Sequence, residues 1–151
     1  MRALIVGASG GLGAAFVALL AGDNRFSDII GWSRSTLPAP HEKVSTTPVD
    51  VCDEATIEAA AQRLGEVDLV IIATGLLHDG DLKPEKTWRS LDPSMMKRVF
   101  EINTIGPALV AKHVLPLLPR DRRAVFAALS ARVGSISDNR LGGWQDRKSV
   151  V

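Results

Sequence analysis

A glycine-rich segment near the start of the chain has the residue types needed to hold a pyrophosphate. It reads GASGGLG and lies between a predicted buried strand and a predicted helix. Gly7 permits a tight turn, Gly11 and Gly13 permit close approach of the backbone, and the helix N-terminus offers N–H groups and a positive dipole end. The segment predicts a nucleotide site made by Gly7, Ser9, Gly11, Leu12 and Gly13. The alternative is a turn that only packs a strand on a helix.

The end of the next predicted strand indicates which dinucleotide such a site would hold. NAD sites of this shape place an Asp or Glu there, about 20 residues after the glycines, to bind the ribose 2′-hydroxyl. Here the segment reads WSRS and has no carboxylate. Arg34, flanked by the hydroxyls of Ser33 and Ser35, suits a 2′-phosphate instead. The sequence therefore favours NADP(H) over NAD as the cofactor, unless Arg34 is an ordinary solvated loop residue.

These groups have to be positioned by strands and helices, which alternate along most of the chain. Apolar runs predict strands at residues 3–6, 28–32, 43–49, 67–73 and 124–129, with helices at 11–21, 54–64 and 93–115. Pro48 places the third strand at a sheet edge, and the aliphatic fourth strand belongs inside the sheet. The alternation predicts an α/β fold, a three-layer doubly wound parallel sheet (Rossmann-like) of about five strands.

Composition limits the partners and the location of the protein. The 151 residues fit one domain, and 18 basic against 17 acidic residues create no broad field that would attract nucleic acid or a membrane surface. Arg120, Arg122 and Arg123 are interpreted as a solvated turn before the fifth strand. The single cysteine excludes an internal disulfide, and no apolar stretch approaches the roughly 20 residues that span a bilayer. We therefore expect a cytoplasmic protein. We also expect no metal site, because His78 and its neighbouring aspartates are typical of a solvated loop.

Several further segments, in order, resemble the short-chain dehydrogenase/reductase family. The glycine spacing G-x-x-x-G-x-G of residues 7–13 matches the family motif. The other matches are PVDVCD with Asp50 and Val51, IIATG with Ala73 and Gly75, NTIGP from Asn103 to Pro107, and ALSARVGSI at the end of the fifth strand. IIATG departs from the family's Asn-Asn-Ala-Gly, because both asparagines are missing. The resemblance covers residues 1 to about 143 and implies cofactor contacts from Asp50, Val51, Ala73 and Gly75.

The resemblance implies hydride transfer between a nicotinamide cofactor and a small carbonyl or alcohol substrate. The family uses a Ser, a Tyr, a Lys and an Asn that holds a relay water. Asn103 fits the last role, because Pro107 cannot donate a helical hydrogen bond to the Asn103 carbonyl and so leaves it open to water. The alternative is a simple break between two helices. Ser130 is the best candidate for the serine, although strict family spacing selects Ala131; Ser135 is the second candidate.

The tyrosine of the family motif is missing, because the chain contains no tyrosine at all. Trp144 and Lys148 have the x-x-x spacing of the motif, but an indole N–H has no accessible acid–base chemistry. We expect a chain that is truncated or altered before this motif, with the C-terminal strands missing. It would have a nucleotide-binding domain at 1–143 and an atypical tail at 144–151. Catalysis by this chain would be impaired or absent.

Two other interpretations stay open. The chain could be a noncatalytic module that binds NADP(H) or forms dimers, and the long helix at 93–115, which packs in subunit interfaces of the family, suggests a homodimer. The chain could also be an enzyme with an unfamiliar acid, in which Lys148 or a water replaces the tyrosine.

Overall fold

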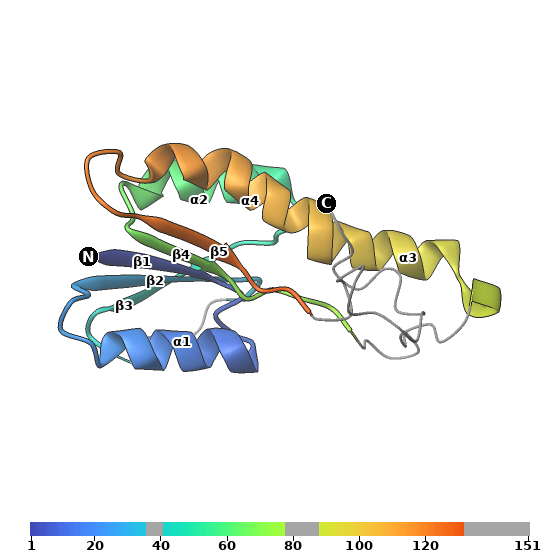
Figure 1. Ribbon diagram of the computed structural model, residues 1–151, viewed down its shortest axis with the longest axis horizontal. Coiled ribbons are helices and arrows are strands. Elements are labelled where there is room, and N and C mark those ends of the chain that lie inside the picture. Colours follow the sequence, from blue (N-terminus) through green and yellow to red (C-terminus); the bar gives the residue numbers. More distant parts are fainter. Residues whose placement is uncertain (36–40, 78–87, 132–151) are drawn as a thin grey trace.

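The computed structural model describes residues 1–35, 41–77 and 88–131 of the chain. Five strands form one parallel sheet with helices on both sides (Figure 1). The strands are β1 (Arg2–Val6), β2 (Asp28–Ser33), β3 (Val44–Pro48), β4 (Leu69–Ile72) and β5 (Val125–Ala128). Each lies within two residues of its predicted bounds. The predicted α/β fold is confirmed.

The order of the strands determines where a binding crevice can open in the sheet. They run β3-β2-β1-β4-β5 across the sheet, so the chain leaves β1 toward one side and returns to β4 on the other side. In such sheets a crevice opens at the carboxyl ends of the strands where the order reverses. That point lies between β1 and β4. The two positional predictions are also confirmed, because β3 is an edge strand and β4 is an inner one.

The helices cover the two faces of the sheet. Helix α1 (Gly11–Ala21) lies on one face, and α2 (Glu54–Leu64) and α4 (Gly106–Val114) lie side by side on the other (Figure 1). Helix α2 begins and ends at the predicted residues. The Asp53 carboxylate accepts a hydrogen bond from the Ala55 N–H at 3.1 Å, and Gly65 takes a φ of +68°, which favours glycine.

Two apolar clusters hold the three layers together. Alternate residues of the strands point to opposite faces. Leu4 and Val6 therefore join the cluster under α2 and α4, whereas Ala3 and Ile5 join the cluster under α1. All four side chains are almost completely buried. Because β1 is covered on both faces, the segment that follows it is held rigidly in place.

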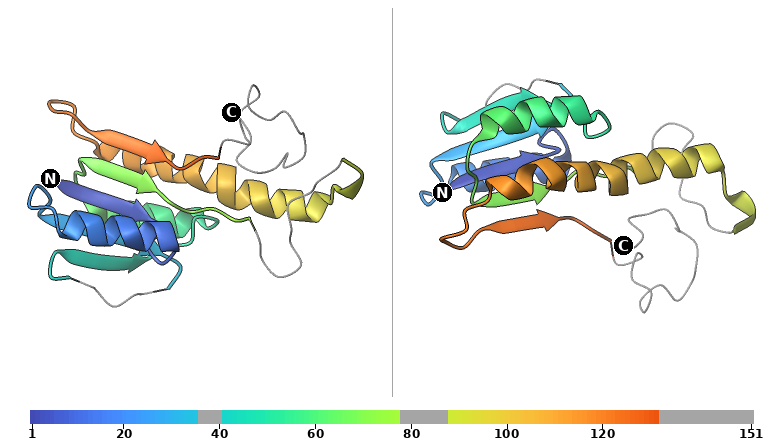
Figure 2. Two further views of the ribbon diagram at one scale, coloured as in Figure 1. Left: turned by 60° about the horizontal axis from the view of Figure 1, so that its bottom comes forward. Right: turned by 90° about the horizontal axis from the view of Figure 1, so that it is seen from above.

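The predicted long helix is present, and it opens at the predicted place, next to Asn103 and Pro107. Helix α3 (Pro93–Phe100) is followed by a π-helical turn (Glu101–Ile105) before α4 begins. The Gly106 N–H donates to the Glu101 carbonyl, one residue wider than an α-helical bond. Pro107 lacks an N–H, and its ring obstructs α-helical geometry there. Figure 2 shows that α3 continues past the carboxyl ends of the strands.

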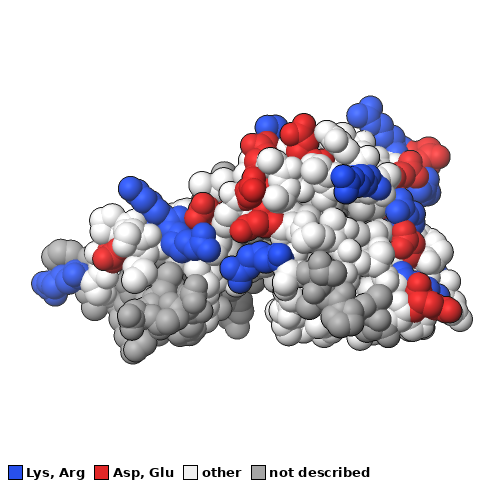
Figure 3. Space-filling view, turned by 180° about the vertical axis from the view of Figure 1, so that it is seen from behind, with Lys and Arg blue, Asp and Glu red and all other residues white. Residues whose placement is uncertain are grey.

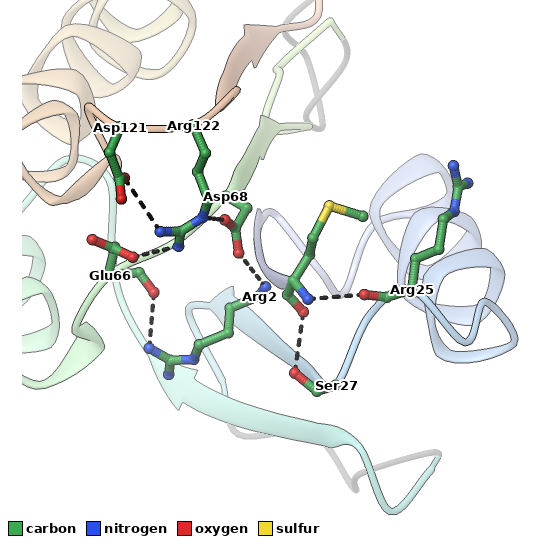
Figure 4. Close-up of polar contacts among 8 residues, drawn as sticks. Arg2, Arg25, Ser27, Glu66, Asp68, Asp121 and Arg122 are labelled. Atoms are coloured by element: carbon green, nitrogen blue, oxygen red, sulfur yellow. Dashed lines mark hydrogen bonds and ion pairs between the residues drawn. The ribbon is translucent and has the colours of Figure 1, made fainter.

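Ionic contacts join strands at the opposite, amino-terminal edge of the sheet (Figure 4). The buried Asp68 carboxylate accepts hydrogen bonds from the Arg2 N–H at 2.7 Å and from the Arg122 Nε at 2.8 Å. Arg122 also pairs with Glu66. Residues 120–123 are exposed and lie in a bend before β5, as predicted. Arg122 also has a role that the sequence did not indicate, because it connects the segment before β5 to the segment before β4.

Several sequence predictions lie outside the described residues. They concern His78 with its neighbouring aspartates, Ser135, Trp144, Lys148 and the tail at 144–151. Within the described ranges, no helix is long and apolar enough to cross a membrane. On the face shown in Figure 3, basic and acidic side chains are interspersed.

Candidate nucleotide site

A pocket opens at the carboxyl ends of β1 to β4, at the crevice that the strand order predicts. Its walls are the segments that follow these four strands, together with the carboxyl end of α3 and the π-helical turn. Eight residues singled out in the sequence line it: Gly7, Ser9, Ser33, Arg34, Asp50, Val51, Ala73 and Gly75. Residues from four distant parts of the chain are thus brought into one cavity.

The glycine loop is tightly built, and its glycines have different reasons to be glycine. Gly7 has a φ of +87°, and its N–H donates to the Trp32 carbonyl at 2.8 Å. A Cβ on Gly13 would lie 2.0 Å from the Gly7 carbonyl oxygen, so helix and loop could not approach as they do. A Cβ on Gly11 would meet nothing within 4 Å. Packing inside the protein therefore explains why residues 7 and 13 are glycines, but it does not explain the glycine at position 11.

The N-terminus of α1 has the properties of an anion site. Gly10 caps the helix without a side-chain hydrogen bond, and no acidic residue lies in the first turn. The N–H groups of Gly11, Leu12 and Gly13 have no acceptor within the part of the chain that the structure describes. Leu12 is 64% exposed. The space above Gly11 and the N–H groups at this helix end fit the pyrophosphate of a dinucleotide.

The segment after β2 places an arginine at the pocket without a competing carboxylate. Ser33 is buried, and its hydroxyl donates to the Ser35 carbonyl at 2.6 Å. This bond shapes the turn and directs the Ser33 proton away from a ligand. Arg34 is exposed and lines the pocket. The guanidinium group is therefore available to pair with a phosphate at this wall.

The segment after β3 forms the adjoining wall. The Asp50 Oδ1 accepts a hydrogen bond from the Cys52 N–H at 2.9 Å, and Val51 packs closely on Gly106, where an added Cβ would lie 3.0 Å from the Val51 Cβ. Burial raises the pKa of the Cys52 thiol, and the carboxylates of Glu101 and Asp50 raise it further. The thiol is therefore held in its neutral form near pH 7.

Asn103 reaches the site through the main chain of Leu76. Its Oδ1 accepts from the Leu76 N–H at 2.7 Å, and its Nδ2 donates to the Leu76 carbonyl at 2.9 Å. The side chain is buried within the π-helical turn. It holds the segment that follows β4 against the helix, while Pro107 cannot donate to the Asn103 main-chain carbonyl.

Ser130 is not brought into the pocket. It follows β5, is exposed, and is not among the described residues that line the cavity. The preceding residue, Leu129, continues the sheet by donating its N–H to the Ile72 carbonyl at 3.0 Å. The serine therefore lies on the β5 side of the crevice, apart from the groups at β2 and β3.

Some pocket residues were missed in the sequence. Arg98, Ile102, Cys52 and Leu76 line the cavity. Arg98 and Ile102 are four residues apart, which is about one helical turn. The helix predicted from residue 93 therefore already placed both residues on the same face. Nothing in the sequence indicated which face of that helix meets the strand ends, because that depends on the direction in which α3 leaves the sheet.

A parallel sheet with helices on both faces and a glycine-bounded pocket at its carboxyl edge defines an α/β protein of the Rossmann-like class. The chain belongs to the short chain dehydrogenase family, whose model matches residues 1–138. A curated relative is 1-hydroxy-2-glutathionyl-2-methyl-3-butene dehydrogenase from Rhodococcus sp. (strain AD45), 35% identical over 99 residues. The match covers 63% of this chain and 40% of that relative.

Two solved structures share the fold. A short-chain dehydrogenase/reductase from Burkholderia multivorans with bound NADP has a TM-score of 0.81 and 24% identity, over 97% of this chain and 65% of that one. An NADPH-bound carbonyl reductase from chicken fatty liver has a TM-score of 0.77 and 24% identity, over 98% of this chain and 62% of that one. The chain thus spans less than two thirds of several of these relatives.

Proposed function

We propose that this chain forms the nucleotide-binding part of an NADP(H)-dependent oxidoreductase that transfers hydride between the nicotinamide and a small carbonyl or alcohol. The observation that carries the proposal is the N-terminus of α1, which has no side-chain cap, has open space above Gly11, and follows directly on Gly10, which lines the pocket. The pyrophosphate would lie there, bound by main-chain N–H groups and the helix dipole. The cofactor would supply the hydride.

The preference for NADP(H) over NAD rests on Arg34. It lies just past the end of β2, where an NAD site places a carboxylate, and its side chain is exposed at the pocket. A guanidinium group there would form charge-assisted hydrogen bonds to a 2′-phosphate. The cofactors of the two structural relatives, NADP and NADPH, agree with this choice.

The catalytic part of the proposal is restricted by composition. Asn103 would hold a relay water at its main-chain carbonyl, and Ser130 would contact the substrate oxygen from the end of β5. The 151 residues contain no tyrosine, so no phenol of this chain can donate or accept the proton that accompanies hydride transfer. We expect the 151-residue protein to bind NADP(H) and to show little or no carbonyl reduction by itself.

The lack of tyrosine also favours a second function, a noncatalytic module that binds NADP(H) or forms dimers. The helical segment from α3 to α4 carries exposed apolar residues, with Met95 37% and Ile105 51% exposed. A second copy packing on this segment would bury them. Sedimentation at micromolar and at higher concentration tests the dimer, since a monomer throughout would contradict it.

Calorimetric titration of the purified protein with NADPH and NADH tests the main proposal. We expect tighter binding of NADPH, and Arg34→Ala should weaken NADPH binding by about ten- to a hundredfold while changing NADH binding little. Arg63→Ala is the matched control, because it removes an exposed arginine from the last turn of α2, outside the pocket. Absence of binding by either nucleotide would refute the proposed function.

A further inference from the structure

The outer wall of the pocket is made by an arginine that the proposed function does not use. Arg98 lies on α3 and lines the same cavity as Arg34, Asp50 and Cys52. Ile102, one helical turn further, lines it too. Among the residues that the structure describes, the pocket is therefore lined by two arginines, one after β2 and one on the helix that passes over the strand ends.

Arg98 is held in place from two sides. Its Nη1 donates to the Glu101 Oε2 at 2.9 Å and approaches the Cys52 Sγ at 3.8 Å. Within the described residues, all of its hydrogen bonds come from Nη1, so the Nε and Nη2 groups and the flat face of the guanidinium stay available. The ion pair with Glu101 restrains the side chain, and so reduces the entropy that it would lose when a ligand binds.

The position of Arg98 identifies the part of the dinucleotide that it meets. If the pyrophosphate lies at α1, beside β1, the adenosine half extends toward β2 and β3, and the nicotinamide half extends toward β4 and β5. Arg98 touches Cys52, which follows β3. It therefore lies on the adenosine side of the pocket.

We propose that Arg98 is a second binding residue of the nucleotide site, and that its guanidinium, positioned by Glu101 and Cys52, stacks on the adenine ring. A planar cation over an aromatic face is attractive, and arginine is the residue that combines charge with a flat surface. The base is common to NADPH and NADH. Arg98 therefore strengthens the binding of both, whereas Arg34 discriminates between them.

The inference rests on the proposed function, and one experiment separates the two. NADPH and NADH affinities are measured by calorimetry for the wild-type protein, Arg98→Leu, Arg98→Lys and Arg34→Ala, with thermal melting to verify that each variant is folded. Arg98→Leu should weaken both nucleotides by the same factor, about three- to tenfold. Arg98→Lys should lose nearly as much, since the charge stays but the planar group is gone. Lys97→Leu is the control, because this neighbouring cation on α3 does not line the cavity.

Each outcome has one meaning. An equal loss for both nucleotides supports stacking on the base. A loss confined to NADPH overturns it, because Arg98 would then act on the 2′-phosphate, and no loss at all overturns any role for Arg98 in the site. If the wild-type protein binds neither nucleotide, the proposed function itself fails. Glu101→Gln should weaken binding in the wild-type background but not in Arg98→Leu, as expected for a residue that acts through Arg98.

Discussion

The carboxamide of Asn103 forms two hydrogen bonds with one residue, Leu76: it accepts from the Leu76 N–H at 2.7 Å and donates to the Leu76 carbonyl at 2.9 Å. This pairing connects the π-helical turn to the segment that follows β4. It spans 27 residues of sequence. The wall of the pocket at Ala73 to Leu76 is thereby attached to the helix that bears Arg98.

Replacing Asn103 should loosen this wall. Asn103→Ala leaves the Leu76 N–H and carbonyl without their partner in a partly buried place, which costs about 1–3 kcal/mol of stability. Urea denaturation measures the loss, and NADPH affinity should fall as well. Thr104→Ala, on the next residue of the turn, should change both quantities much less. Equal effects of the two variants would show that the pairing has no special role.

Two glycines of the loop should respond in opposite ways to alanine. Gly13→Ala places a Cβ 2.0 Å from the Gly7 carbonyl oxygen and should destabilise the fold by about 1–3 kcal/mol. Gly11→Ala has free space and should leave stability unchanged or raise it by up to about 1 kcal/mol, because alanine favours helix. Thermal or urea unfolding of both variants makes the comparison.

The Gly11→Ala variant also tests the proposed anion site. Although Gly11→Ala should keep the fold, its methyl group occupies the space proposed for the pyrophosphate, so NADPH binding should weaken at least about tenfold. Calorimetry on the folded variant gives the answer. Undiminished binding would place the pyrophosphate elsewhere.

The contacts of Asp68 should make stability depend on pH in the acid range. Hydrogen bonds from the Arg2 N–H and from Arg122 lower its pKa below the usual value of 3.8. Its folded pKa is below the unfolded one, so its stabilisation is complete above about pH 4 and is lost as pH falls through the folded pKa. Asp68→Asn should cost about 1–3 kcal/mol at pH 7 and progressively less below pH 4.

Urea denaturation of wild type and Asp68→Asn at several pH values between about 7 and 3 tests this dependence. Asp121→Asn is the control, because that side chain is 83% exposed although it also lies beside Arg122. A gap between wild type and Asp68→Asn that stays constant down to pH 3 would be inconsistent with the ionic contact.

Cys52 should react slowly with alkylating reagents. Its pKa is raised by burial and by the carboxylates of Glu101 and Asp50, and the thiolate is the reactive form. At pH 8 we expect iodoacetamide to modify the folded protein at least about threefold more slowly than the urea-unfolded chain. Mass spectrometry follows the reaction at this single cysteine, and bound NADPH should slow it further. Equal rates in the folded and unfolded states would contradict the burial argument.

The sequence by itself determined the fold class, most element bounds and the glycine loop, because these depend on local signals. Continuous apolar runs, helical apolar spacing, the cap at Asp53 and the glycine that ends α2 act within a few residues. It also indicated the edge position of β3, because Pro48 has no N–H to donate to an inner ladder.

Only the tertiary structure decided which residues meet across the pocket. Arg98 comes to Cys52 across the pocket, and near it Gly106 packs closely on Val51. The structure also places Ser130 after β5, on the opposite side of the crevice from the groups at β2 and β3. Such placements arise from packing between segments distant in the chain, and local residue patterns do not encode the distance between two such segments.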